Sequence, residues 1–205
     1  ALTTGALTAG SQREAETAHA REQRSNALYG MARDLSGAIA VEQVIEITRR
    51  FLREAVGADC LLLLPDAEEN LQSFPADSPF RAEIHLAHMA MQQQAPVECA
   101  LISSGGYALS YFSLRAPTRT RGVLAVAPLQ GDLNLIREQR ALIETAASLV
   151  AIALERLHYV EAAQRAEISA SAERLRASLF SALSHDLRTP LTALRGTAET
   201  LALTC

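Results

Sequence analysis

A histidine and an aspartate stand next to each other near the C-terminus, in the sequence SHDLRTPLT at residues 184–192. Read as a helix at ~100° per residue, this stretch separates an apolar stripe from a polar face. The polar face carries His185, with Thr189 one turn further along, and Asp186 lies within reach of the imidazole. A carboxylate that accepts the N–H of one ring nitrogen raises the nucleophilicity of the other, so these residues indicate nucleophilic chemistry at His185. The apolar stripe comprises Leu179, Leu183, Leu187, Leu191 and Leu194.

Pro190 lies four residues before the end of that stripe. A proline inside a helix removes one backbone hydrogen bond and bends the axis, at a cost of ~3 kcal/mol. Pro190 therefore either ends the helix or kinks it. The apolar spacing continues beyond it through Leu191, Leu194, Ala198 and Leu201, which favours a kinked but continuous helix.

Residues 184–192 resemble the H-box of sensor histidine kinases, and residues 179–201 are most similar to the KdpD sensor kinases of bacterial potassium regulation. The alternative is an amphipathic helix on which histidine and aspartate are adjacent by chance. The resemblance implies that His185 is the phospho-acceptor, Asp186 its acid–base partner, and Thr189 the residue that orients water during phosphoryl hydrolysis. It also implies ATP and magnesium for the intact kinase, a response regulator as partner, and potassium limitation or ionic stress as the signal.

A long helix is expected to present this motif. Asp132 or Asn134 can cap it, and no stop signal interrupts residues 135–180, a span of about 70 Å at 1.5 Å per residue. Its second half has apolar residues spaced by four and three, which is typical of a coiled-coil seam and predicts a homodimer through this helix. The polar residues 161–167 indicate either a segment that shifts at low cost or a solvated linker. The seam comprises Ile168, Ala172, Leu175, Leu179 and Ala182.

Two helices are predicted before the first strand. Residues 1–11 are small and polar and are expected to be mobile, and residues 12–36 form a charged N-terminal helix. Its arginines alternate with glutamates, which favours a solvated face over a role in binding anionic lipid. A second helix is expected over residues 41–55, with Gly57 well placed to terminate it.

Four strands are predicted from short apolar or alternating runs, the last two as a hairpin. A helix is expected over residues 80–93, because Ser78 and Pro79 resemble an N-cap followed by a first-turn proline. Residues 96–106 are expected to be irregular. The strands cover residues 59–64, 71–74, 107–114 and 122–127.

This order of elements is an α+β pattern, with an antiparallel sheet flanked by helices and followed by the long helix. It is similar to a GAF domain, and residues 115–126 resemble the KdpD version. The resemblance divides the chain into a GAF domain at 37–155, a signalling helix at 156–178, and a truncated first helix of the dimerisation and phospho-acceptor domain at 179–205. Residues 91–106 replace the aromatic and glycine-rich segment usual in the family, so the sequence assigns no ligand-binding residues.

Composition excludes several classes of protein. The 205 residues are 49% hydrophobic with a net charge of −4, which argues against disorder and against a general nucleic-acid role. The three cysteines have no metal-ligand spacing and are expected to be reduced thiols. His85 and His88 are three apart on a predicted helix, but no acidic or cysteine cluster completes a site, so no metal is expected.

No apolar run approaches the ~18–20 residues that span a bilayer, and no signal-peptide pattern is present, so we expect a soluble chain. It begins without methionine and stops in mid-pattern, which suggests a piece of a longer protein. The family resemblance implies that the parent is anchored in the inner membrane and that this segment is cytoplasmic. No phosphate-binding loop or kinase ATP-binding motif occurs, so the segment should be inactive alone.

The function expected from these observations is that of the sensory and phospho-acceptor part of a two-component sensor histidine kinase. The alternative is a non-catalytic GAF module for ligand binding and dimerisation.

Overall fold

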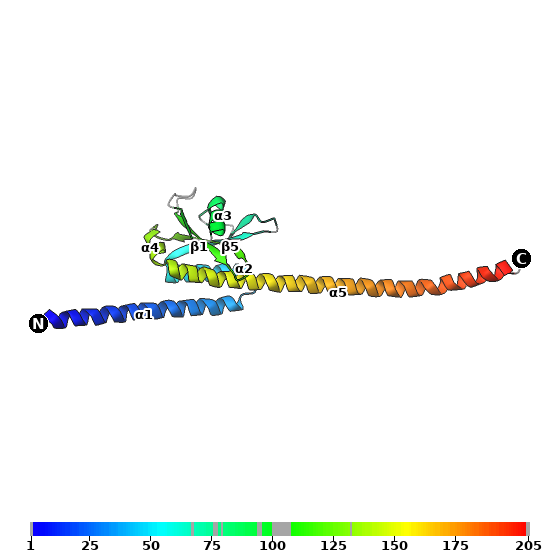
Figure 1. The fold of residues 1–205 in the computed structure, drawn as a ribbon, viewed down its shortest axis with the longest axis horizontal. Coiled ribbons are helices and arrows are strands. Elements are labelled where there is room, and N and C mark those ends of the chain that lie inside the picture. The colour runs from blue at the N-terminus through cyan, green and yellow to red at the C-terminus, as the bar shows by residue number, and fades with distance from the viewer. Residues whose placement is uncertain are drawn as a thin grey trace. The chain divides into compact units, whose positions relative to one another are not determined.

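The computed structural model describes residues 2–66, 68–75, 78, 80–93, 96–99, 108–131 and 133–203. Side chains are described for these residues except 2–17, 20, 98–99, 133, 181–182 and 184–203. The chain forms two compact units, residues 1–157 and 158–205. Figure 1 shows the sheet and its helices within the first unit. The predicted α+β architecture, an antiparallel sheet flanked by helices and followed by a long helix, is confirmed.

The sheet has five antiparallel strands in the order β2-β1-β5-β4-β3. All four predicted strands are present. The fifth, β3, lies where the sequence predicted irregular structure, and this prediction was wrong. Three residues are too few to give a strand pattern, and β3 is fixed by pairing with β4, where Val97 lies opposite Tyr111. The strands are β1 (Ala58–Pro65), β2 (Leu71–Phe74), β3 (Val97–Cys99), β4 (Leu109–Arg115) and β5 (Thr120–Pro128).

The hairpin of β4 and β5 depends on a glycine at the point where β5 also meets β1. Gly122 has φ +152°, and a Cβ atom there would lie 2.3 Å from the carbonyl oxygen of Leu63. The pairing register shifts between Leu114 and Arg115, opposite this glycine. Only a residue without a side chain allows the backbones of β1 and β5 to approach this closely.

The sheet separates two hydrophobic cores because successive side chains of a strand point to opposite faces. Cys60 and Leu62 of β1 pack with α2 and the first turns of α5, whereas Leu61 and Leu63 pack with α3. Figure 1 shows these helices on opposite faces of the sheet. The helices are α1 (Leu2–Gly37), α2 (Val41–Ala55), α3 (Ile84–Gln93), α4 (Leu133–Glu138) and α5 (Arg140–Leu203).

Of the first two helices, α2 agrees with the sequence prediction and α1 differs from it at its start. α2 has the predicted bounds, and Gly57 follows it with φ +72°, a conformation that favours glycine. α1 begins at Leu2 instead of residue 12. The sequence before residue 12 contains no proline, so the helical hydrogen-bond ladder is not interrupted there.

α3 begins four residues later than predicted, at Ile84. Phe80, where the helix was expected to start, is instead buried in the core beside α3. The backbone N–H of Glu83 donates to the hydroxyl oxygen of Tyr111 at 2.8 Å. The carbonyl of Glu83 then accepts the first helical hydrogen bonds, from Leu86 and Ala87. The contact with β4 therefore sets the start of α3.

The long helix begins at Arg140, because the chain leaves helical geometry at Gln139 and divides the predicted helix into α4 and α5. No glycine or proline marks this break. α5 then continues through Pro190 to Leu203, so the prediction that Pro190 does not end the helix is confirmed. Among the described residues, no helix combines the length and the apolar character that crossing a membrane requires.

Candidate functional site

The residues of the SHDLRTPLT motif lie on the backbone of α5, within the second unit. His185 and Thr189 are separated by one helical turn, ~6 Å along the axis, and Asp186 is adjacent to His185. Their side chains lie outside the described residues. The structure thus brings the three positions together on one continuous helix, and the roles expected for them stay predictions.

The predicted seam of α5 is open to solvent in the single chain. The seam residues Ile168, Leu175 and Leu179 have 71%, 66% and 63% of their surface exposed, and Leu183, which follows the seam, has 55% exposed. These side chains lie seven, four and four residues apart, so they share one face of the helix. An exposed apolar face of this length is typical of a surface that pairs with another helix.

The last buried turn of α5 connects two distant parts of the first unit. Glu155 accepts hydrogen bonds from Thr118 and, at 3.2 Å, from Arg121 in the hairpin of β4 and β5. The hydrogen bond from Thr118, followed by that from Arg121, lowers the pKa of Glu155. Arg156 donates to the carbonyl oxygens of Leu35 and Ser36, in the last turn of α1, and of Ala38, which follows the helix. A charged donor therefore binds carbonyls at the end of α1, where the helix offers no further N–H groups, and the Leu35 carbonyl also accepts the N–H of Ala38.

A second buried charge joins α2 to the sheet. Asp59, at the start of β1, accepts two hydrogen bonds of 2.8 Å from Arg49 and one of 2.7 Å from Arg53. The backbone N–H of Cys60 donates to the same carboxylate at 2.8 Å. Burial alone would raise the pKa of Asp59, but the hydrogen bonds from Arg49 and Arg53 outweigh it and lower the pKa to about 2.

Sequence reasoning missed both groups of contacts, those of Glu155 and Arg156 on α5 and those of Asp59 on β1. Arg156 contacts residues about 120 positions away in the chain, and no local pattern marks such a contact. Asp59 offered a weak signal, because an aspartate that opens an apolar strand requires a buried partner. Cys60 is buried in the core, which confirms the prediction for this cysteine, and its burial raises the pKa of the thiol.

A cavity of about 530 Å³ lies beside the start of α3 and is lined by residues of β1, β2 and the segment 78–84. Leu61, Leu63 and Phe80 give it an apolar wall, and Arg81 adds a positive charge. The hydroxyl of Ser78 is buried there without a hydrogen-bond partner among the described residues. Of residues 91–106, which replace the segment usual in the family, residues 94–95 and 100–106 lie outside the described residues.

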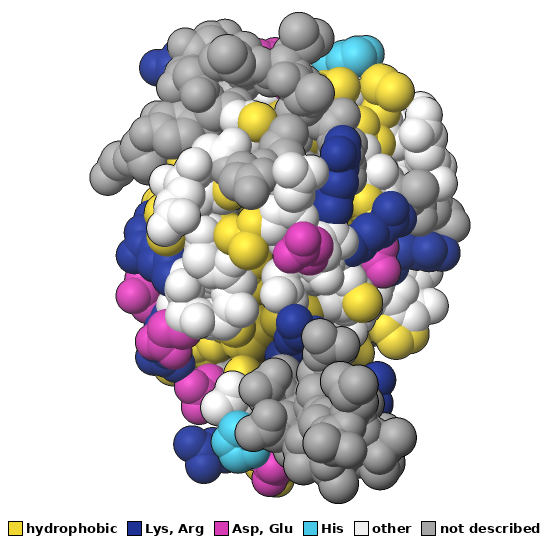
Figure 2. Space-filling model, turned by 90° about the vertical axis from the view of Figure 1, so that its left-hand side faces the viewer, with side chains coloured by type: hydrophobic (Ala, Val, Ile, Leu, Met, Phe, Trp, Pro, Cys, Tyr) yellow, Lys and Arg dark blue, Asp and Glu magenta, His cyan; other side chains and the backbone are white. Residues whose placement is uncertain are grey.

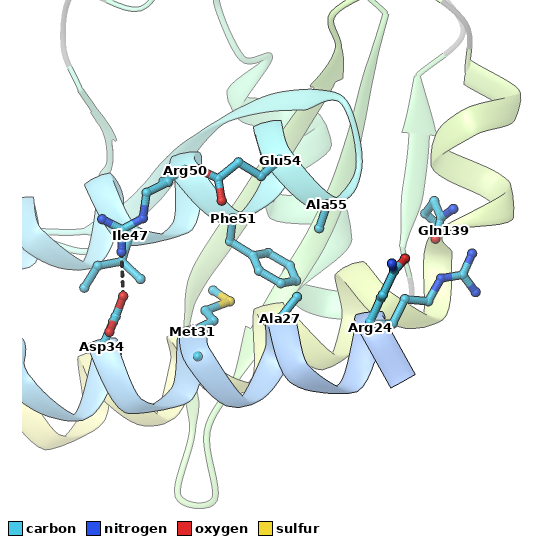
Figure 3. Close-up of a pocket in the computed structure, with 12 residues that line it drawn as sticks. Arg24, Ala27, Met31, Asp34, Ile47, Arg50, Phe51, Glu54, Ala55 and Gln139 are labelled. Atoms are coloured by element: carbon cyan, nitrogen blue, oxygen red, sulfur yellow. Dashed lines mark hydrogen bonds and ion pairs between the residues drawn. The ribbon is translucent and has the colours of Figure 1, made fainter. Parts of the chain in front are cut away.

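A second cavity, of about 590 Å³, lies between α1 and α2. Figure 3 shows Phe51 and Met31 at its middle, with Arg24 and Gln139 at one end. The face of the molecule in Figure 2 carries arginines and acidic residues interspersed, with hydrophobic side chains visible between them. No sequence pattern indicated this cavity.

The two histidines weighed as metal ligands, His85 and His88, are both exposed on α3. Within the part of the chain that the structure describes, no group of three or more histidine, cysteine, aspartate or glutamate side chains is placed to hold a metal ion.

Comparison with known proteins finds relatives for each of the two units. Residues 175–204 match the His Kinase A (phospho-acceptor) domain family. The sensor protein KdpD of Escherichia coli K12 is 34% identical over 98% of the chain, and that of Clostridium acetobutylicum is 26% identical over 96%. The chain spans 23% of the length of each relative.

Solved structures give the fold of the first unit. The crystal structure of the GAF domain of the E. coli potassium sensor histidine kinase KdpD superposes with a TM-score of 0.57 at 26% identity, covering 68% of this chain and 99% of that one. The GAF domain of a putative sensor histidine kinase from Pseudomonas syringae gives 0.53 at 17% identity, covering 74% and 98%. The chain is therefore similar to KdpD sensor proteins along nearly all of its length, with a GAF fold that precedes a stretch matching the phospho-acceptor family.

Proposed function

We propose that His185 is the phospho-acceptor of a longer, KdpD-like sensor histidine kinase. The observation that supports this proposal is the match of residues 175–204, a range that includes His185, to the phospho-acceptor family. In this reaction a ring nitrogen of His185 attacks the γ-phosphorus of ATP. The bond to the leaving oxygen of ADP breaks, and the phosphoryl group then passes to an aspartate of a response regulator.

Asp186 and Thr189 are proposed to serve two different steps. Asp186 accepts the N–H of one imidazole nitrogen and so directs the lone pair of the other toward phosphorus. Thr189 lies one turn away and positions the water that hydrolyses a phosphoryl group. This hydrolysis is a separate step from the attack of His185 on ATP. Thr189→Ala should therefore impair the phosphatase activity of the full-length kinase more than its autophosphorylation. An equal loss of both activities would contradict the assigned role.

The relatives support further proposals for the full-length protein. KdpD is a potassium sensor by the name of its solved GAF domain, so we propose that this kinase responds to potassium or ionic stress. ATP and magnesium are then required by the full-length kinase, and a response regulator is its partner. We place the segment on the cytoplasmic side of an inner-membrane protein.

Two copies of the chain are proposed to pair through α5. The exposed side chains of Ile168, Leu175 and Leu179 form the contact, and a parallel pair brings both copies of His185 to the same level. Burying a leucine is worth ~1.5–3 kcal/mol, so several exposed leucines favour association by several kcal/mol. Sedimentation equilibrium at micromolar concentration should show a dimer. The double change Leu175→Asp/Leu179→Asp should abolish it and Leu191→Asp should not, whereas a monomeric wild type would contradict the pairing.

Supplying a histidine-kinase ATP-binding domain in trans tests the phospho-acceptor directly. Labelled ATP should transfer phosphate to the wild-type chain and not to His185→Gln, while circular dichroism of the two proteins stays the same. If His185→Gln also loses its folded state, the histidine is structural. Labelling that persists in His185→Gln would refute the proposal.

The second candidate function is ligand binding by the GAF fold without phosphotransfer. The cavity beside α3, with its buried Ser78 hydroxyl and Arg81, favours it. The two functions are compatible in one protein. They are separated by the trans-labelling experiment, because a pure binding module does not accept phosphate at His185.

A further inference from the structure

The cavity between α1 and α2 lies outside everything assigned so far. It is on the face of the sheet opposite the cavity beside α3, and its volume of about 590 Å³ is in the range of small-molecule sites. Its lining comes from α1, α2 and the single residue between α4 and α5, so all of it belongs to the first unit. Figure 3 shows the lining side chains.

The middle of the cavity is apolar. Phe51 and Met31 are buried and face each other across it, with Ala27 and Ala55 beside them. An aromatic ring and a thioether form a wall that accepts an apolar group of varied shape.

The two ends of the cavity differ in their polar groups. At one end Asp34 and Arg50 are already paired, with 2.6 Å between the carboxylate and the guanidinium. At the other end the side-chain oxygen of Gln139 is buried and has no hydrogen-bond partner among the described residues. Figure 3 shows Arg24 at that same end, and no ion pair links it to another described residue. A buried acceptor without a donor is unfavourable, and a ligand that supplies a donor would offset this cost.

The charges of the lining select the class of ligand. Arg24 and Arg50 are balanced by Asp34 and Glu54, so the cavity as a whole has no net charge to attract a simple anion. A zwitterion meets this balance. An adjacent ammonium and carboxylate would supply the donor to Gln139 and the anion to Arg24 at one end, while an attached apolar group reaches Phe51.

We propose that this cavity binds a free apolar α-amino acid, with its carboxylate at Arg24, its ammonium at Gln139 and its side chain against Phe51 and Met31. The inference stands apart from phosphotransfer, because no residue of the cavity belongs to the SHDLRTPLT motif.

The test uses L-phenylalanine, titrated into the chain and followed by NMR or calorimetry. We expect saturable binding, weakened about tenfold or more by Arg24→Gln and by Gln139→Leu, since tenfold corresponds to the loss of one charge-assisted contact. 3-Phenylpropionate, which lacks the ammonium, and phenethylamine, which lacks the carboxylate, should bind at least tenfold more weakly.

The matched control is Arg81→Gln, which removes an arginine from the cavity beside α3 and should leave the affinity for phenylalanine unchanged. Each variant is first checked by circular dichroism. Phe51→Leu serves as a second probe of the apolar wall if Gln139→Leu does not fold, and it should weaken phenylalanine binding. The proposal is overturned if phenylalanine does not bind at millimolar concentration. Binding that is insensitive to Arg24→Gln, or lost in Arg81→Gln, also overturns it.

Discussion

Replacing Asp59 by asparagine removes a buried negative charge and keeps the shape of the side chain. Asp59 has only 5% of its surface exposed and accepts hydrogen bonds from two arginines and from the N–H of Cys60. Asparagine retains one acceptor oxygen but leaves the charges of Arg49 and Arg53 without a carboxylate. We therefore expect Asp59→Asn to destabilise the first unit at neutral pH.

The pKa of Asp59 sets the size and the pH range of this effect. In the folded protein the pKa of the Asp59 carboxyl group is lowered from its ordinary value of 3.8 to about 2. At about 1.36 kcal/mol per pKa unit, the charged form contributes ~2 kcal/mol of stability. Because the folded pKa is the lower one, this contribution is complete above pH ~4 and is lost as the pH falls through ~2.

Urea unfolding followed by circular dichroism, at several pH values, measures the difference between wild type and Asp59→Asn. The free energy of unfolding of the two proteins should differ by ~2 kcal/mol at pH 6, and by less than about half of that at pH 2.5. Other carboxylates titrate in both proteins, so their contributions cancel in the comparison. A difference that stays constant from pH 6 to pH 2.5 would refute the assigned ion-pair cluster.

Two further changes test the packing of the first unit. Gly122→Ala places a Cβ atom 2.3 Å from the carbonyl oxygen of Leu63 and should lower the free energy of unfolding, measured in urea, by ~3 kcal/mol or more. The control is Gly37→Ala, whose new Cβ has no atom within 4 Å and should cause no measurable loss of stability. Arg156→Gln removes the donor to the last carbonyls of α1 and should cost ~1–3 kcal/mol, with faster amide hydrogen exchange in the last turn of that helix. The exposed pair of Arg165 provides the control, since Arg165→Gln should change stability by less than ~0.5 kcal/mol. Equal effects of the two arginine substitutions would contradict the contact with α1.

The elements that the sequence predicted well are those set by local spacing. The bounds of α2 follow from its amphipathic pattern and from Gly57, and β1 follows from a short apolar run. The continuation of α5 past Pro190 was predicted because apolar residues recur at helical spacing on both sides. The motif around His185 was evident for the same reason, since its residues are contiguous in the sequence.

The elements that the sequence did not predict depend on contacts between distant residues. β3 exists because β4 offers it a pairing edge, and α3 starts at Ile84 because Tyr111 engages the backbone of Glu83. The contacts of Arg156 with α1 and the cavity lined by Gln139 likewise arise only when separate helices come together. Periodicity along one segment carries no information about such partners.

The identity of the phosphorylated residue in the full-length kinase tests the central claim most directly. After incubation with ATP and magnesium, peptide mapping by mass spectrometry at neutral pH should find phosphate on His185, in a linkage that is lost on brief acid treatment. The same kinase with His185→Gln should carry no phosphate and retain its circular dichroism spectrum. Phosphate on any other residue of the wild type, or an acid-stable linkage, would contradict the account.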